Sequence, residues 1–529
     1  MSDPICFFNQ LTLQWSHEPL WSGLSSSLPA GVTALVGPNG HGKSALLEVL
    51  AGRYLPTHGQ VTWSVPFYYQ TQLDPLTGPR VADALGVASL FDAFSRLEQG
   101  DAEPSDLERV ADHWHRPAEW AKQLTDAGLE PDLGLPVEAL SGGQRTRLAL
   151  CRALMQTGHY LLLDEPSNHL DSAGRHWLQQ ALARHPGGAL VVSHDRTLLR
   201  GVDRILELRN GQLVEYGGGF DLYQAQRDAQ LAAQEQRLDH LTGQQRRLQQ
   251  QQQATLEKAA SRRQQGMQER RSHSQGKLLL GLRKNRSEQT QARLSQQQTQ
   301  RRDALNEDRQ TAQAELEQLR TQRLTITQPK VTGAVQVHLA NLRLPFVRQP
   351  ALSWTVHGGD RWRVTGANGC GKSLLLKCLA EWIEPLAGER EVRGSVRYLD
   401  QHFSGLDPSA SALENLQRDQ PERPASELRT QLASVRLRGD QALQPVASLS
   451  GGERLKVALL SILSHQTPVD ILLLDEPDNH LDLDSKALLE QALLDYGGTL
   501  VIVTHDDAFA EALALGHELK LGEPGRAHS

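Results

Sequence analysis

The chain has 529 residues, of which 39% are hydrophobic, and a formal net charge of −7. This length exceeds what one hydrophobic core usually serves and predicts two to four domains. We expect a cytoplasmic protein without a membrane segment or secretory leader, because no apolar run approaches roughly 18–20 residues and the start MSDPICFFNQ lacks a basic-then-apolar pattern.

The four cysteines fit that compartment. Cys6, Cys151, Cys370 and Cys378 form no CxxC pair and no framework of a small disulfide-rich domain. We therefore expect reduced thiols and no zinc site.

In chain order, the first part of the sequence alternates short apolar runs with helical stretches. VTALVG precedes the glycine-rich loop GPNGHGKS (37–44), and the helical run SALLEVLAG follows it. The run RTRLALCRALM follows LSGGQR (140–145), and the apolar runs HYLLLDEP and GALVVSHD come next. Continuous apolar runs are typical of buried parallel strands, so the pattern predicts an α/β fold with a helix-covered parallel sheet.

The middle of the chain has a different composition. About a quarter of residues 224–326 are Gln, and Leu231, Leu238, Leu241 and Leu248 are spaced as one apolar seam of a helix. Leu305, Ala312, Leu316 and Leu319 give a second seam, and SHSQGKLLLGL (272–282) is the best place for a turn. We predict an antiparallel α-helical, coiled-coil hairpin; a disordered polar linker is the alternative.

The same middle segment is basic. Residues 221–330 hold 20 Lys and Arg against 12 Asp and Glu, a net charge of +8 that leaves −15 for the rest of the chain. Ten of these cations and only three Glu lie in 255–295, around the expected tip. The interpretation that we favour is contact with nucleic-acid phosphates, and a solvated charged coil is the alternative.

The last part of the chain repeats the first. GANGCGKS (366–373), LSGGER (449–454) and VIVTHD (501–506) echo the motifs above, and LLLDEPDNHLD (472–482) echoes LLLDEPSNHLD (161–171). A tandem duplication explains this order. We predict three domains: a first half (residues 1–220), a linker hairpin (221–330) and a second half (331–529).

The repeated motifs carry the chemistry of phosphate binding. Both glycine loops satisfy GxxxxGK[ST] between a strand and a helix, where backbone N–H groups and a lysine would hold nucleotide phosphates. The expected phosphate-binding residues are Gly37, Asn39, Gly40, Gly42, Lys43 and Ser44 in the first half and Gly366, Asn368, Gly369, Gly371, Lys372 and Ser373 in the second.

Polar residues at the ends of apolar strands complete each site. Asp164 and Asp475 are positioned to hold magnesium, and the adjacent Glu165 and Glu476 to polarise an attacking water as catalytic residues. His194 and His505 would sense the terminal phosphate. The expected magnesium ligands are Ser44, Gln70 and Asp164 in the first half and Ser373, Gln401 and Asp475 in the second, with Gln72 as a neighbouring alternative to Gln70.

Taken in order, these motifs resemble the ATP-binding cassette ATPases, for which LSGG is the marker. The resemblance implies two P-loop cassettes that meet head to tail, so that Ser450, Gly451 and Gly452 face the first glycine loop and Ser141, Gly142 and Gly143 face the second. It also implies an adenine-stacking aromatic, for which Trp15 and Phe346 are the candidates; ordinary core aromatics are the alternative.

DEPSNHLD and DEPDNHLD narrow the resemblance to the ABC-F subfamily of soluble tandem-cassette proteins. It implies a monomer with an intramolecular cassette pair that hydrolyses ATP with Mg²⁺ at both sites. It further implies that the hairpin tip meets ribosomal RNA and tRNA near the ribosomal E site, thereby modulating translation. Asp478 departs from the usual Ser or Thr, and we expect only local capping to change.

Three other functions stay open. A ribosome-protecting antibiotic resistance factor would share every motif. The motor of a membrane transporter would need a permease, and it seldom carries a basic hairpin between fused cassettes. A DNA-repair ATPase usually has its coil between the glycine loop and LSGG of one domain, whereas this coil joins two complete ones.

Overall fold

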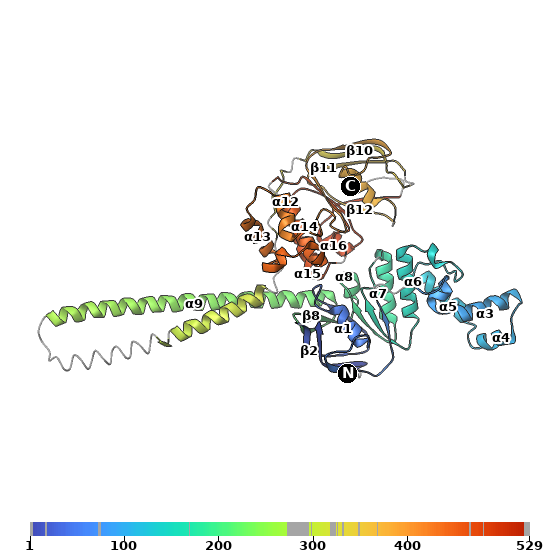
Figure 1. The fold of residues 1–529 in the computed structure, drawn as a ribbon, viewed down its shortest axis with the longest axis horizontal. Coiled ribbons are helices and arrows are strands. Elements are labelled where there is room, and N and C mark those ends of the chain that lie inside the picture. Colours follow the sequence, from blue (N-terminus) through green and yellow to red (C-terminus); the bar gives the residue numbers. More distant parts are fainter. Residues whose placement is uncertain are drawn as a thin grey trace. The chain divides into compact units, whose positions relative to one another are not determined.

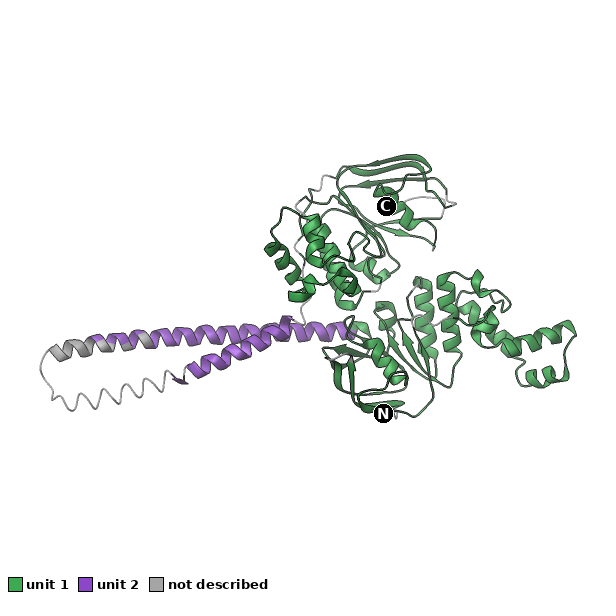
Figure 2. Cartoon of the chain, in the orientation of Figure 1, with its two compact units in different colours: residues 1–221, 321–529 green, residues 222–320 purple. Residues whose placement is uncertain are grey.

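The structure is a computed structural model that describes residues 4–522 apart from 16–17, 72–75, 169, 272–295, 298, 318–323, 325, 331–332, 348–349, 368, 465–466 and 480. Residues 1–221 and 321–529 form one unit, and residues 222–320 form another (Figure 2). The first unit contains both halves of the duplication. The second contains most of the polar middle segment.

A six-stranded sheet organises the first half, in the order β5-β6-β7-β3-β8-β9 (Figure 1). Only β9 runs antiparallel to its neighbour; the other pairs are parallel. The strands are β1 (Cys6–Trp15), β2 (Glu18–Leu28), β3 (Val32–Val36), β4 (His58–Trp63), β5 (Phe67–Gln70), β6 (Tyr160–Asp164), β7 (Ala189–Val192), β8 (Arg204–Arg209) and β9 (Gln212–Gly217). The helices are α1 (Lys43–Leu50), α2 (Val81–Leu85), α3 (Ala88–Gln99), α4 (Pro104–Val110), α5 (Arg116–Asp126), α6 (Gly142–Leu154), α7 (Ser172–Arg184) and α8 (Arg196–Arg200).

The second half repeats this plan with a five-stranded parallel sheet in the order β14-β15-β16-β12-β17. Its strands are β10 (Val335–Arg343), β11 (Leu352–His357), β12 (Arg361–Thr365), β13 (Ala387–Val392), β14 (Val396–Leu399), β15 (Ile471–Asp475), β16 (Thr499–Val503) and β17 (His517–Lys520). Its helices are α11 (Lys372–Leu379), α12 (Ala412–Asp419), α13 (Ala425–Ser434), α14 (Gly451–Leu463), α15 (Leu483–Asp495) and α16 (Asp507–Ala512).

Inner strands of each sheet are buried, as their apolar sequence predicts. Every residue of β3, β7 and β16 is buried, because helices and a small antiparallel sheet cover the two faces. That small sheet has the order β2-β1-β4 in the first half and β11-β10-β13 in the second. Phe8, Leu35 and Leu47 belong to one core cluster, so β1, β3 and α1 pack together and fix the glycine loop between β3 and α1. The predicted α/β class is confirmed.

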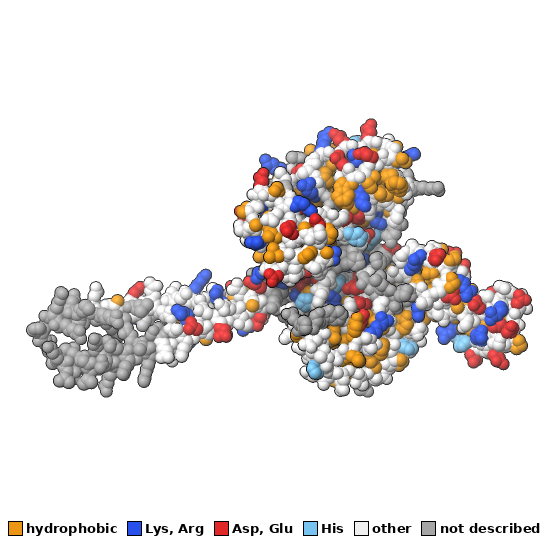
Figure 3. Space-filling model, in the orientation of Figure 1, with side chains coloured by type: hydrophobic (Ala, Val, Ile, Leu, Met, Phe, Trp, Pro, Cys, Tyr) orange, Lys and Arg blue, Asp and Glu red, His pale blue; other side chains and the backbone are white. Residues whose placement is uncertain are grey.

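The first half carries an extension, α3 and α4, which Figure 1 shows projecting away from the sheet. Arg96 on α3 binds Asp106 on α4 through two N–H groups, and Asp106 is 1% exposed. Figure 3 shows charged side chains of both signs over this end. The longer interval before LSGG in the first half is therefore a helical arm, and it is not a basic surface.

The middle segment contains the predicted pair of helices. α9 (Phe220–Arg271) has 52 residues and so spans roughly 78 Å at 1.5 Å per residue. Residues 299–317 are also helical. Arg237 pairs with Glu315 at 3.1 Å and Gln245 with Asn306 at 3.0 Å, so the helices run antiparallel. The hairpin is confirmed for these residues, whereas the expected turn at 272–282 lies outside the described residues.

No helix within the described parts of the chain combines the length and apolar character that a membrane-spanning helix needs.

Candidate functional site

The first glycine loop joins β3 to α1 and curls around the side chain of Lys43. Gly37 has φ of +145°, and a Cβ there would lie 2.1 Å from the carbonyl oxygen of Leu208, so only glycine fits. The Lys43 ammonium donates to the carbonyls of Gly37 at 2.8 Å and Pro38 at 3.0 Å. The loop therefore places a buried cation at the N-terminus of a helix, an arrangement that binds phosphate.

The second glycine loop has the same geometry. Gly366 has φ of +148°, and Lys372 donates to the carbonyls of Gly366 at 2.8 Å and Ala367 at 3.1 Å. Gly371 precedes α11 with φ of +98°, matching Gly42 before α1 at +87°. Gly40 and Gly369 also have positive φ, of +82° and +79°. Asn368 lies outside the described residues.

The strand-end aspartates lie beside these loops but have different partners. Asp164, the last residue of β6, accepts a hydrogen bond from Ser44, which partly offsets the rise in its pKa that burial causes. Its other oxygen, Oδ1, is buried without a hydrogen-bond partner. Asp475, the last residue of β15, accepts from the Tyr398 hydroxyl at 3.0 Å. One carboxylate thus has a buried free oxygen, and the other is engaged by a tyrosine.

Each candidate catalytic glutamate faces the histidine that we expect to sense the terminal phosphate. Oε1 of Glu165 lies 3.4 Å from Nε2 of His194, and the equivalent distance from Glu476 to His505 is 3.6 Å. Both glutamates have left-handed backbones, with φ of +49° and +48°. Glutamate rarely adopts this conformation, and such strain concentrates at functional sites.

Burial sets the protonation of these groups. It raises the pKa of Glu165 to about 8, with Lys43 opposing and Asp164 assisting, and it also raises the pKa of Glu476. Burial lowers the pKa of His194 well below its ordinary value, with Lys43 acting in the same direction. It also lowers the pKa of His505, to about 4. Both histidines are therefore neutral near pH 7, and each glutamate is a stronger base than in water.

The two candidate glutamines are not structurally equivalent. Gln70 ends β5, pairs with Leu163 and has a buried Oε1 without a hydrogen-bond partner. Gln401 lies two residues beyond β14, whose last residue, Leu399, takes the place of Gln70 in the ladder. The position that matches Gln401 in the first half is therefore 72, which lies outside the described residues.

Both LSGG segments begin helices. Ser141 accepts a hydrogen bond from the backbone of Gln144 and precedes α6, and Ser450 does the same with Glu453 before α14. Gly142, Gly143, Gly451 and Gly452 form the first turns, where backbone N–H groups have no acceptor within the helix and can bind an anion. Their placement against the opposite glycine loop stays a prediction.

Of the two candidate aromatics, Phe346 lies near its glycine loop. Phe346 is 93% exposed, with φ of +62°, in the turn after β10. An ideal Cβ on Gly371 would lie 3.3 Å from Val347, so this turn packs beside the second loop. Trp15 ends β1, and its side chain lies outside what the structure describes. The exposure of Phe346 fits stacking on a ligand better than a place in the core.

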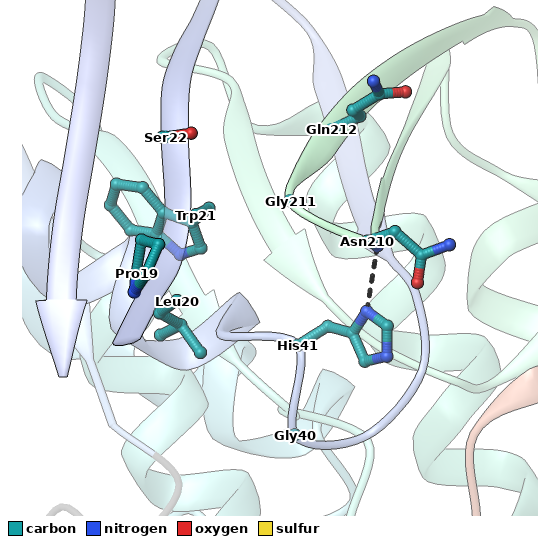
Figure 4. Close-up of a pocket in the computed structure, with 9 residues that line it drawn as sticks. All are labelled: Pro19, Leu20, Trp21, Ser22, Gly40, His41, Asn210, Gly211 and Gln212. Carbon is teal, nitrogen blue, oxygen red and sulfur yellow. Dashed lines mark hydrogen bonds between the residues drawn. The ribbon is translucent and has the colours of Figure 1, made fainter. Parts of the chain in front are cut away.

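A pocket of about 520 Å³ adjoins the first glycine loop, between the start of β2 and the turn from β8 to β9 (Figure 4). The backbone N–H of Asn210 donates to Nδ1 of His41 at 3.1 Å, so the proton of the neutral ring is on Nε2. The indole N–H of Trp21 is buried without a partner. The pocket thus offers the Nε2–H of His41 as a donor beside the loop, whereas the Trp21 indole nitrogen is covered.

Sequence reasoning missed the contacts between the halves. The backbone N–H of Asn39, in the first glycine loop, donates to Oδ2 of Asp482 at 2.8 Å. Asp482 also caps α15 by accepting from the backbone of Ser485 at 2.8 Å. Arg196 binds both carboxylate oxygens of Glu490, at 2.6 and 3.0 Å. Asp482 is the final residue of the second NHLD motif, and the repetition of that motif was the sequence signal that could have indicated its role.

The first site fits a magnesium ion bound together with a nucleotide. Within the described parts of the chain, no group of three His, Cys, Asp or Glu side chains could hold a metal alone. Ser44 and the free Oδ1 of Asp164 supply oxygens, the donors that Mg²⁺ prefers alongside phosphate and water. The second site offers Asp475, one oxygen of which accepts from Tyr398.

Comparison with protein families defines the class. Residues 22–168 and 350–479 match the family described as ABC transporter, one match in each half. Together these matches cover more than half of the chain. The chain therefore belongs to the ATP-binding cassette (ABC) family and carries two ATP-binding cassettes.

Similarity to individual proteins narrows the class to ABC-F. The chain is 31% identical to the tylosin resistance ATP-binding protein TlrC of Streptomyces fradiae, over 97% of this chain and 96% of TlrC. It is 29% identical to the energy-dependent translational throttle protein EttA of Mycobacterium tuberculosis, over 92% of this chain and 86% of EttA. Both are ABC-F proteins, so the predicted resemblance is confirmed.

A solved structure supports the fold alone. The archaeal ribosome recycling factor aABCE1, in complex with the ribosomal stalk protein aP1, has a TM-score of 0.54 at 19% identity. The alignment covers 98% of this chain and 89% of that one.

Proposed function

We propose that this ABC-F protein hydrolyses ATP at both sites and uses the cycle to act on the ribosome during translation. The observation that carries the proposal is the pairing of a half-buried glutamate with a neutral histidine beside a glycine loop, found twice. Neither site has lost its lysine, aspartate, glutamate or histidine.

The residues of each site have distinct roles in hydrolysis. Lys43 or Lys372 exchanges its loop carbonyls for phosphate oxygens when ATP binds. Magnesium, bound through Ser44 and Asp164 or Ser373 and Asp475, would neutralise phosphate charge. Glu165 or Glu476 accepts a proton from the attacking water, and neutral His194 or His505 donates a ring N–H to an oxygen of the terminal phosphate.

Binding by both cassettes would close the sites. The helix N-termini after Ser141 and Ser450 supply N–H donors for the nucleotide held by the opposite cassette. Because both cassettes belong to one chain, a monomer suffices. Exposed Phe346, together with Trp15 in the first half, is proposed to stack on adenine.

Two observations support the ribosome as the partner. EttA is named a translational throttle. The middle segment has a net charge of +8, and its expected tip is rich in Lys and Arg, which suits contact with rRNA and tRNA phosphates.

The test uses a chain that binds ATP without turning it over. The Glu165→Gln, Glu476→Gln double variant should hold the cassettes closed with ATP and retain ribosomes on affinity purification. The matched control is the same variant with ADP, which should release them. Absence of ribosomal RNA from the ATP sample, or recovery of a permease in its place, contradicts the proposal.

A resistance role is the second candidate, favoured by the likeness to TlrC. If the protein protects ribosomes, its expression in a sensitive host should raise the inhibitory concentration of a macrolide such as tylosin, and the Glu165→Gln, Glu476→Gln variant should not. An unchanged inhibitory concentration favours the general translation factor.

A further inference from the structure

Asp478 breaks the symmetry between the two ATP sites. It occupies the variable position of the motif DEPxNHLD, where the first cassette has Ser167. Asp478 is 2% exposed, and a buried carboxylate is expensive unless it is paired. Its burial therefore calls for specific partners.

The first partner lies next to the switch histidine. The Thr504 hydroxyl donates to Oδ1 of Asp478 at 3.0 Å, and Thr504 directly precedes His505. In the first cassette the equivalent contact joins the hydroxyls of Ser167 and Ser193 at 3.2 Å. A hydrogen bond to a charged acceptor is stronger than one between neutral groups. The Thr504–Asp478 bond therefore holds His505 more firmly to the loop that carries Glu476 than the Ser167–Ser193 bond holds His194 to its loop.

Asp478 also belongs to a buried charge cluster that both cassettes build. Arg175 pairs with Asp195 at 3.2 Å in the first cassette, and Lys486 pairs with Asp506 at 3.1 Å in the second. All four side chains are at most 11% exposed. Without Asp478 the cluster would hold two cations and two anions in symmetric pairs; Asp478 adds a third anion on one side.

Arg175 of the first cassette acts on that extra anion. Burial, the largest influence, and Asp506 raise the pKa of Asp478, whereas Lys486 and Arg175 lower it. A cavity of about 40 Å³ between the cassettes is lined by Arg175, Asp478 and Lys486, and also by Glu165 and His194 of the first site; it has space for water but not for a nucleotide. The cluster is therefore a joint between the cassettes that lies beside the first ATP site.

The geometry of the loop connects this joint to the chemistry. Asp478 lies two residues after Glu476, and the Asp478–Thr504 hydrogen bond holds that loop against the strand end that carries His505. A shift of Asp478 would alter the 3.6 Å approach of Glu476 to His505. The first cassette has neutral Ser167 at the position that corresponds to Asp478. Lys486 of the second cassette therefore meets no anion at that position of the first cassette.

We propose that Asp478 is a positioning residue that links His505 of the second ATP site to Arg175 of the first cassette, so that closure is transmitted to the second site more strongly than to the first. This inference rests on the proposed hydrolysis of ATP. Asp478 acts through Thr504 and the catalytic loop, and it does not touch the reacting atoms.

A double-mutant cycle on the full chain tests the link, with kcat and KM for ATP as readouts. Asp478→Asn keeps an oxygen for Thr504 but removes the charge, so the fold should survive. We expect this change to lower kcat about fivefold, with KM changing less than about twofold, and to have almost no effect in an Arg175→Gln chain. In an Arg175→Lys chain, where the charge remains, Asp478→Asn should again lower kcat.

The mirror cycle is the control. Ser167→Ala should change kcat by the same factor in the parent chain and in a Lys486→Gln chain. Equal effects of Asp478→Asn with and without Arg175→Gln, in variants whose melting temperatures match the parent, overturn the inference. Equal coupling in the mirror cycle overturns it too. A parent chain that hydrolyses no ATP overturns the proposed function and this inference together, whereas additive variants of an active parent overturn only the inference.

Discussion

Glu165 combines a half-buried carboxylate with the role proposed for it as general base, and this combination sets a pH dependence. Its pKa is raised to about 8, so the carboxyl group is protonated, and useless as a base, below that pH. In a Glu476→Gln chain, where only the first site has its glutamate, kcat/KM for ATP should fall about tenfold per pH unit below pH 8 and level off above it. Steady-state phosphate release measures this, and a flat profile contradicts the assignment.

Gly37 and Gly40 provide a matched pair for the glycine loop. A Cβ on Gly37 would lie 2.1 Å from the Leu208 carbonyl oxygen, whereas one on Gly40 would meet nothing within 4 Å. Gly37→Ala should therefore displace the loop and weaken ATP binding more than tenfold, while Gly40→Ala should cost only about 1 kcal/mol of backbone strain. Titration with a fluorescent ATP analogue compares them, and equal losses would argue that strain alone matters.

At single positions the sequence indicated which residues form the candidate site, but it gave less information about which side chains contact one another. Its spacing predicted Lys43, Asp164, Glu165 and His194 as site residues, because phosphate chemistry restricts which residue types can serve there. It could not show that Asp478 is buried in a charge cluster; we expected only a change in capping, but Asp482 is the cap of α15. Burial and ion pairing depend on packing between segments distant in the chain.

The helix pair of the middle segment belongs to the scale of elements, and Leu316 and Glu315 test its pairing. Leu316 is 2% exposed, whereas Glu315 pairs with Arg237 on the surface. Leu316→Ala should destabilise the segment by about 2 kcal/mol or more, and Glu315→Ala by less than about 1 kcal/mol. Hydrogen exchange of α9 in the full chain reports both, and a larger effect of Glu315→Ala contradicts the buried seam.

The elements could be predicted well where periodicity was strong. The leucine spacing predicted α9 and its partner helix. The glutamines were less predictable: Gln70 and Gln401 stand at similar distances from their lysines, but strand register separates them by two residues. Register depends on which strands pair, which a count of residues cannot reveal.

At the scale of the whole molecule, the Arg196–Glu490 pair joins the cassettes. Both side chains are at most 13% exposed, and the pair is bidentate. Arg196→Glu or Glu490→Arg alone should lower the closed population of the ATP-bound Glu165→Gln, Glu476→Gln chain more than fivefold, because like charges would meet at the joint. The double exchange should restore much of it.

Fluorescence energy transfer between dyes on the two cassettes measures that closure. A double exchange no better than either single change would mean that the pair does not act across the joint. The duplication itself predicted two cassettes that cooperate. The particular contacts, such as Asn39 with Asp482 across 443 residues, required the three-dimensional fold.

The left-handed backbone at Glu165 and Glu476 has a consequence for heat resistance. Glycine would hold the same conformation at about 1 kcal/mol lower free energy at each position. A chain with both glutamates replaced by glycine should therefore outlast its parent on warming while losing its turnover. Selection for thermal stability alone would have favoured glycine at both positions. The two strained glutamates therefore mark positions where selection for catalytic activity outweighed selection for stability.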